Sequence, residues 1–153
     1  FKQKTAYEVL RGLVGSEMCI RDRGDTETAG ALIADDIAYV NVGLPVVHGR
    51  QEMAKVFALL DRPAAGFEVY LHAISADGAV VLTERTDVLV FGRLRAQFWV
   101  WGRFDVHDGK ITLWRDSFDY LDLVRGFLRG LAGMVVPALN PRPPRDTHDA
   151  PGR

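Results

Sequence analysis

The chain has 153 residues, of which 48% are hydrophobic and 25% are charged, and this composition predicts one globular domain with a substantial core. Its 19 basic and 20 acidic residues give a formal net charge of −1, without the basic surplus expected of a nucleic-acid or anionic-membrane binder. The single cysteine excludes an internal disulfide, and no apolar run reaches the roughly 18 residues that a membrane-spanning helix needs. We therefore expect a cytoplasmic protein with no nucleic-acid partner and no membrane partner.

The beginning of the chain differs in character from the rest. Residues 1–23 resemble translated sequencing-adapter text and do not open with Met, so we expect a non-native artefact without a functional role. On this interpretation the functional domain covers residues 24–136 and is followed by a proline-rich, disordered tail over residues 137–153. The alternative is a genuine amphipathic helix with an apolar face formed by Tyr7, Leu10, Leu13 and Val14.

Two helices and a strand are predicted in the first part of the domain. Residues 25–34 begin with a capping Asp25 and continue as an Ala, Leu and Ile run, which predicts a short helix. Residues 37–42 alternate as a short strand that places Tyr39 and Asn41 on one face. A second helix is predicted over residues 51–60, where the apolar positions recur at helical spacing: Met53, Val56, Phe57 and Leu60.

After Gly66 the hydrophobic period changes to two. This pattern predicts an antiparallel sheet whose strands cover residues 67–75, 80–91, 94–107 and 110–117. Asp-Gly pairs, which favour tight hairpin turns, follow the first and the third of these strands. Helices before a curved sheet and a closing helix after it predict an α+β domain.

The closing helix is predicted over about residues 120–133. We expect it to pack an apolar stripe against the concave side of the sheet, formed by Leu121, Val124, Leu128 and Leu131. Gly126 and Gly130 lie four residues apart on the same helix, and we expect them to permit close packing.

The strand over residues 80–91 carries a charged pair between apolar ends. Side chains two apart in a strand share a face, so Arg85 and Asp87 point the same way. Burial of such a pair costs several kcal/mol unless the charges satisfy each other. The pair is either a structural salt bridge or part of an active site.

Other polar residues are expected to converge on this pair. Tyr39 and Asn41 share one strand face, and Asp116 shares another with the large apolar Trp114. Two acids beside one guanidinium in a dry cavity favour a state in which one acid holds a proton and the other is ionised. Concerted acid–base catalysis needs this combination.

Three segments carry a resemblance to a known family. The ERTDV strand, the AYVN strand and the segment GRFDVHDGKITLWRDSFDYLDLVRGFLRGL resemble the limonene-1,2-epoxide hydrolase family, within the nuclear transport factor 2-like (NTF2-like, SnoaL-like) superfamily. The resemblance covers residues 24 to about 133. It implies a cone-shaped fold in which a curved, mixed or antiparallel sheet is wrapped by N-terminal helices and closed by a C-terminal helix.

The resemblance also implies a reaction and a set of roles. Water attacks an epoxide directly to give a vicinal diol, with no covalent intermediate and no cofactor or metal. Asp116 resembles the general base, Tyr39 and Asn41 the residues that position the water, Asp87 the general acid, and Arg85 the bridge between both carboxylates. No metal-ligand spacing links the four histidines, His48, His72, His107 and His148.

The substrate is expected to be a small apolar epoxide, such as limonene oxide, another cyclic epoxide or a lipid epoxide. Six residues are candidates for the pocket wall, although each also suits core packing: Leu89, Phe98, Trp114, Phe118, Leu123 and Leu131. The other face of the sheet carries Trp99 and Trp101 between polar residues, and family resemblance implies a homodimer packed through this face. The alternative is that these tryptophans pack under a local loop of the same chain.

Two other function classes fit the same fold. Proton transfer on carbon, as in ketosteroid isomerases and polyketide cyclases, needs one carboxylate and an oxyanion donor, but no Arg85 bridge between two acids. A non-catalytic dimer that binds a small molecule is the other class. Such a protein has no reason to keep five polar groups in an apolar cavity.

Overall fold

The computed structural model describes residues 5–15, 30–59 and 62–144. Within these ranges lie the elements α1 (Ala6–Gly15), β1 (Ile33–Asn41), β2 (Val47–His48), α3 (Arg50–Ala58), β3 (Ala65–Asp77), β4 (Val80–Phe91), β5 (Leu94–His107), β6 (Lys110–Phe118), α4 (Tyr120–Val135) and the 3-10 helix η1 (Pro137–Leu139). No helix in the described residues has both the length and the apolar composition needed to cross a membrane.

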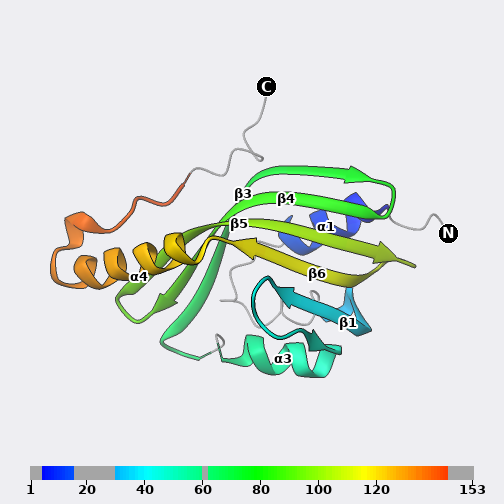
Figure 1. Ribbon diagram of the computed structural model, residues 1–153, viewed down its shortest axis with the longest axis horizontal. Coiled ribbons are helices and arrows are strands. Elements are labelled where there is room, and N and C mark those ends of the chain that lie inside the picture. The colour runs from blue at the N-terminus through cyan, green and yellow to red at the C-terminus, as the bar shows by residue number, and fades with distance from the viewer. Residues whose placement is uncertain (1–4, 16–29, 60–61, 145–153) are drawn as a thin grey trace.

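The described strands form one six-stranded sheet in the order β2-β1-β6-β5-β4-β3 (Figure 1). β1 and β6 are parallel and the other neighbours are antiparallel, so the sheet is mixed. Asp108 and Gly109 both have positive φ, 50° and 73°, as the two central residues of a type I′ hairpin turn require. The α+β prediction with a curved, mixed sheet is confirmed.

The strand predictions for residues 80–91 and 94–107 match β4 and β5 in both bounds. The predicted helix over residues 25–34 is wrong at its end, because β1 already begins at Ile33. Ile33 is paired with Ile111 of β6, and this pairing outweighs the helical preference of the Ala and Leu run. Residues 25–29 of that prediction lie outside the described residues.

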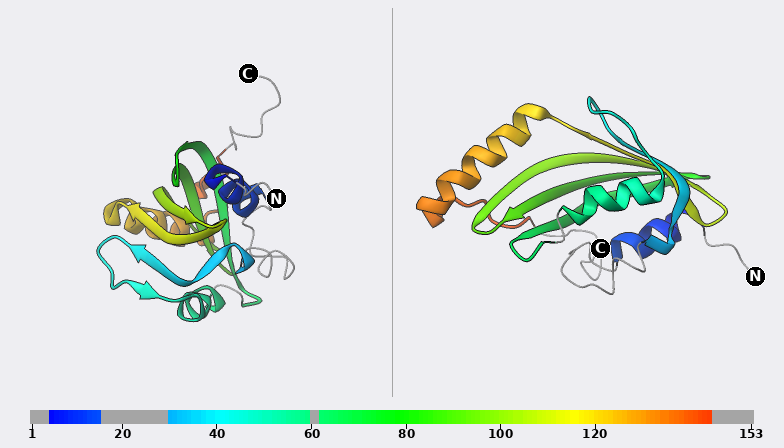
Figure 2. Two further views of the ribbon diagram at one scale, coloured as in Figure 1. Left: turned by 90° about the vertical axis from the view of Figure 1, so that its right-hand side faces the viewer. Right: turned by 90° about the horizontal axis from the view of Figure 1, so that it is seen from below.

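Two helices lie against the concave side of the curved sheet (Figure 2). From α1, Val9 and Leu10 are fully buried and join one core cluster with Met53 of α3 and residues of the sheet. The sheet contributes Ile37, Tyr39, Val81, Phe104, Val106, Ile111 and Trp114 to this cluster. α1 is therefore an amphipathic helix, which was the alternative interpretation of the first residues. That residues 1–23 are a non-native artefact stays a prediction.

α4 contacts the sheet differently from the prediction. The apolar stripe of Leu121, Val124, Leu128 and Leu131 is exposed, so its predicted packing on the sheet is wrong. Buried glycines form the contact instead: a Cβ at Gly126 would lie 2.5 Å from the backbone oxygen of Gln97 in β5. The prediction that the glycines permit close packing is confirmed.

The register of the sheet explains this contact. β6 ends at Phe118, which pairs with Val100, so the remainder of β5 toward Leu94 has no strand on that side. α4 follows β6 directly and runs along this part of β5 (Figure 1). The Asp122 carboxylate accepts a hydrogen bond from the Trp99 backbone N–H at 2.9 Å. α4 therefore lies beside β5 along the part of that strand where β6 has ended.

The chain after α4 returns along the helix. η1 follows at once, and Arg129 Nε donates a hydrogen bond to the Leu139 carbonyl at 2.9 Å. Asn140 Nδ2 donates to the Gly133 carbonyl at 3.2 Å. The first residues of the predicted tail are thus held against α4, and residues 145–153 lie outside the described residues.

Candidate active site

Arg85 joins two buried carboxylates on the inner face of the sheet. Its Nε lies 2.9 Å from Asp87 Oδ1, and its Nη2 lies 2.7 Å from Asp116 Oδ2. The third nitrogen, Nη1, donates to Thr83 Oγ1 at 3.4 Å. All four residues are at most 5% exposed, so the guanidinium and the two carboxylates are compensated mainly by one another rather than by solvent.

Strand pairing places the other predicted residues beside this cluster. β1 runs parallel to β6, with Tyr39 next to Trp114 and Asn41 next to Asp116. Tyr39 is 9% exposed, and its ring packs edge-on against Trp114 at 5.6 Å between centroids. The structure therefore brings Tyr39, Asn41, Arg85, Asp87 and Asp116 together on one face, as the strand pattern predicts.

Burial and neighbouring charges shift the pKa values of Asp87 and Arg85 within the cluster. Burial raises the pKa of Asp87 to about 6, although the adjacent Arg85 charge and hydrogen bond act in the opposite direction; the Asp116 charge adds to the rise. For Arg85, burial alone would lower the pKa, but the two carboxylates outweigh it and raise the pKa above its ordinary value. The guanidinium is thus permanently charged, whereas Asp87 is shifted toward its neutral form.

Tyr39 is held neutral at any physiological pH. Burial and the negative charge of Asp116 raise its pKa to about 12, while a hydrogen bond with Asn41 acts in the opposite direction. A neutral phenol has both a donor and an acceptor for a water molecule.

Asp116 has one oxygen available for further bonding. Within the described part of the chain, its Oδ1 is buried and has no hydrogen-bond partner, while its Oδ2 contacts Arg85. Trp114 Nε1 on the same strand face is likewise buried without a partner among the described residues. A buried carboxylate oxygen without a partner is costly, so Asp116 Oδ1 retains an unused capacity to accept a hydrogen bond.

The predicted pocket residues fall into different environments. Phe98 lies opposite Asp87 in the β4–β5 register, and its ring contacts Phe118 at 5.7 Å between centroids. Leu89, two residues from Asp87, is half-buried on the same face. Leu123 of α4 is half-buried, whereas Leu131 is 50% exposed. Trp114 lies within the core cluster, in ring contact with Tyr39, Phe57 and Phe104.

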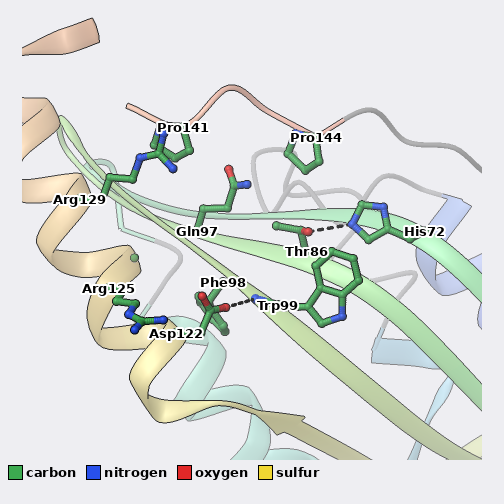
Figure 3. Close-up of a pocket in the computed structure, with 11 residues that line it drawn as sticks. His72, Thr86, Gln97, Phe98, Trp99, Asp122, Arg125, Arg129, Pro141 and Pro144 are labelled. Carbon is green, nitrogen blue, oxygen red and sulfur yellow. Dashed lines mark hydrogen bonds between the residues drawn. The ribbon is translucent and has the colours of Figure 1, made fainter. Parts of the chain in front are cut away.

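A cavity of about 430 Å³ lies on the outer side of the sheet (Figure 3). Thr86, Gln97 and Trp99 in its wall alternate along the strands with the inner residues Asp87 and Phe98. Of the predicted pocket residues only Phe98 reaches it, and none of the five polar site residues does. The remaining wall is formed by His72, Asp122, Arg125, Gly126, Arg129, Pro141 and Pro144. The predicted polar site and this cavity are therefore on opposite faces of the sheet.

Metal-binding chemistry has no visible support in the described residues. Nowhere among them do three His, Cys, Asp or Glu side chains come together in a group that could hold a metal ion.

The family model that matches this chain describes the limonene-1,2-epoxide hydrolase catalytic domain, and the match covers residues 13–129. The chain belongs to the limonene-1,2-epoxide hydrolase family. The resemblance noted in the sequence is thereby confirmed, together with the prediction that the protein is a hydrolase of this type. The Arg85 bridge and its two carboxylates lie inside the matched range.

Individual relatives agree with this assignment. The chain is 51% identical over 115 residues to epoxide hydrolase EphG from Mycobacterium tuberculosis, covering 75% of this chain and 76% of that protein. A solved M. tuberculosis structure of an LEH-like epoxide hydrolase superposes with a TM-score of 0.82 at 42% identity, covering 94% of this chain and all of the other. An NTF2-like protein from Burkholderia pseudomallei reaches 0.66 at 15% identity, covering 81% of this chain and 98% of the other, which shows the fold alone.

Sequence reasoning missed two neighbours of Arg85. Thr83 shares the alternating face with Arg85 and Asp87, so the period of two offered a signal for it. Gly102 lies opposite Thr83 and also opposite Asp116, and only the strand register reveals this position.

Proposed function

We propose that this member of the limonene-1,2-epoxide hydrolase family converts an apolar epoxide to a vicinal diol by direct attack of water. In this proposal Tyr39 and Asn41 position the water, and Asp116 takes a proton from it as the new C–O bond forms. Asp87 gives a proton to the epoxide oxygen as the ring C–O bond breaks. Arg85 stays charged throughout and orients both carboxylates.

The electrostatics of the cluster support these opposite roles. Asp87 has a pKa raised to about 6, so its protonated form is accessible near neutral pH, as a general acid requires. Asp116 has a buried Oδ1 without a partner in the described residues, which suits an oxygen that accepts a proton from water. After one turnover Asp116 holds a proton and Asp87 has lost one, and exchange with solvent restores the starting state.

The observation that carries the proposal is the bridge from one guanidinium to two buried carboxylates. Ring opening needs a base on the water and an acid on the oxygen at the same moment, each contributing about 10²–10⁴-fold. One bridging cation fixes both acids in a single geometry and balances the charge as the proton positions change. A single-base proton transfer on carbon needs no such bridge.

The substrate class in this proposal is a limonene-1,2-epoxide-like, other cyclic, or lipid epoxide. The support is the apolar character of the inner face next to the acids, where Leu89, Phe98 and Phe118 lie. These side chains offer dispersion contacts and no hydrogen bonds, so they select for shape and apolar surface.

The test is hydrolysis of limonene oxide and cyclohexene oxide in ¹⁸O-water under single turnover, followed by mass spectrometry of the diol. We expect solvent label in the first-turnover diol and a loss of about 10²–10⁴-fold in rate for Asp116→Asn. Asp105→Asn is the matched control, because Asp105 pairs with Arg103 on β5 outside the buried cluster. Label that enters only in later turnovers would indicate a covalent intermediate, and a fully active Asp116→Asn variant would contradict the assigned base.

A further inference from the structure

The guanidinium of Arg85 lies against a wall that has no side chain. Gly102 of β5 pairs with Thr83 on one side and with Asp116 on the other. A Cβ added to Gly102 would lie 2.5 Å from Thr83 Oγ1, 2.9 Å from Phe104 Cε2, and closer still to Arg85 Nη1. Separations below 3.0 Å are essentially never seen for real Cβ atoms. The space that a side chain at position 102 would occupy is therefore taken by Arg85 and its neighbours.

The backbone at Gly102 does not itself demand glycine. The described glycines with positive φ are Gly43, Gly49, Gly78, Gly92 and Gly109, and Gly102 is not among them. Alanine can adopt the backbone conformation at this position. What excludes it is the contact of its Cβ with the contents of the charge cluster.

We propose that Gly102 and Thr83 are positioning residues for the proposed epoxide hydrolysis. Gly102 leaves room for the Arg85 guanidinium, and Thr83 accepts a hydrogen bond from it, so that Arg85 is held against both catalytic carboxylates. The inference rests on the proposed function for its catalytic consequence and on the geometry alone for the placement of Arg85. Arg85 directs Nε and Nη2 to Asp87, Nη2 also to Asp116, and Nη1 to Thr83, so each of its three guanidinium nitrogens has a partner.

A methyl group at position 102 would move the guanidinium. Arg85 has a long side chain whose end can shift, whereas the paired backbones of β4, β5 and β6 cannot separate without loss of the sheet. A shift of the fork lengthens the contacts of 2.9 Å to Asp87 and 2.7 Å to Asp116. Both acids then lose their common orientation while the fold remains.

The test compares Gly102→Ala with Gly66→Ala. Gly66 also lies inside a strand without positive φ, and a Cβ there would meet only Val90 Cβ at 3.6 Å, an ordinary contact. We expect Gly102→Ala to lower kcat for limonene oxide by about 10–100-fold with KM changed less than about threefold, because misplaced groups slow the chemical step. Gly66→Ala should keep the parent kcat.

A second readout is independent of turnover. The charged or titratable groups around Asp87 are Arg85, Asp116 and Tyr39, and the Arg85 charge lowers the pKa of Asp87. Displacement of Arg85 should therefore move the Asp87 titration, followed by the pH dependence of the free energy of unfolding, to higher pH in Gly102→Ala. An unchanged titration midpoint would overturn the proposal, whether kcat falls or not.

The two readouts separate this inference from the proposed function. Parent protein that turns over no epoxide would contradict the function, while a shifted midpoint in Gly102→Ala would still establish the placement of Arg85. If Gly102→Ala does not fold, the double variant Gly102→Ala/Arg85→Lys decides, because lysine has no Nη atoms to meet the methyl group. A double variant that folds supports the inference. If the double variant does not fold while Arg85→Lys alone does, the clash lies at Phe104 or Thr83 and the inference is overturned.

Discussion

At the residue scale, the raised pKa of Asp87 predicts how activity depends on pH. A general acid must be protonated to act, and the pKa of Asp87 in the free enzyme is about 6. We expect kcat/KM for a neutral epoxide to fall as pH rises through about 6, approaching a tenfold decrease per pH unit above it. The measurement is a kcat/KM profile between pH 4.5 and 9 in buffers of constant ionic strength. A profile that is flat from pH 5 to 8 would contradict the assignment of Asp87 as the acid.

The same shift predicts the pH dependence of stability. The pKa of Asp87 is about 6 in the folded state and close to 4 in an unfolded chain, so between these values the folded state holds a proton that the unfolded state has released. The Asp87 contribution to stability is therefore full below pH 4 and is lost as pH rises through about 6, with a total of about 3 kcal/mol. Urea unfolding of the parent and of Asp87→Asn at several pH values isolates this contribution, which the variant should lack.

Removal of the bridging charge should damage the fold as well as the reaction. Arg85→Ala leaves Asp87 and Asp116 buried near each other without their shared cation. Loss of one partner of a buried ion pair typically costs about 3–5 kcal/mol. We expect a lower midpoint in urea unfolding at pH 8, and a smaller loss at pH 5, where a protonated acid relieves the repulsion. Equal or greater stability at both pH values would show that the cluster is not a satisfied buried network.

Much of the site could be predicted at this scale, and the limit has a physical origin. The alternation of residues 80–91 placed Arg85 and Asp87 on one face without knowledge of the neighbouring strands. The approach of Asp116 and Asn41 depends on the parallel pairing of β1 with β6, which local periodicity does not encode. The role of Gly102 could not be predicted from the sequence, because it depends on the absence of a side chain and therefore has no functional group to recognise.

At the element scale, the length of α4 could be predicted from hydrophobic periodicity, but the side of the helix that contacts the sheet could not. Its extent and its glycines were predicted, but the apolar stripe was assigned to the sheet and is exposed. The physical reason is that β6 ends beside Val100, so α4 meets backbone atoms of β5 rather than a face of side chains. Glycine alone brings a helix axis close enough for such a contact.

This contact predicts the effect of Gly126→Ala. Alanine favours a helix over glycine by about 1 kcal/mol, but a Cβ at this position would lie 2.5 Å from the Gln97 carbonyl oxygen, which the sheet holds in place. We expect the clash to outweigh the gain in helix propensity, with a net destabilisation of about 1–3 kcal/mol in urea unfolding. Leu128→Ala on the exposed side of α4 is the control and should change stability by less than about 0.5 kcal/mol. A stabilised Gly126→Ala variant would mean that the helix moves freely along β5.

At the scale of the whole molecule, we propose a homodimer packed through the outer face of the sheet. Trp99 and Trp101 are 42% and 57% exposed on that face, and Leu82 beside them is 54% exposed. Aromatic side chains of this size, exposed together, are typical of the buried centre of an interface.

The prediction is that Trp101→Glu converts the dimer to a monomer, because a buried carboxylate without a partner opposes association. Sedimentation equilibrium of the parent and the variant measures this change. Leu128→Glu on the exposed stripe of α4 is the matched comparison. A parent monomer would overturn the homodimer, and a dimer lost only in Leu128→Glu would move the interface to α4.

The position of α4 has a further consequence for the behaviour of the protein in a crowded solution. An unpaired strand edge is a template on which other chains add strands, and such edge-to-edge growth is the first step toward amyloid. Here β2 ends the sheet with only two residues, and β3 at the opposite end is interrupted by a bulge between Leu71 and Ala73. The part of β5 that β6 leaves unpaired is covered by α4, because the Asp122 carboxylate accepts a hydrogen bond from the Trp99 N–H and the glycines of α4 lie against β5 carbonyls. α4 thus prevents a strand of another chain from pairing with this part of β5.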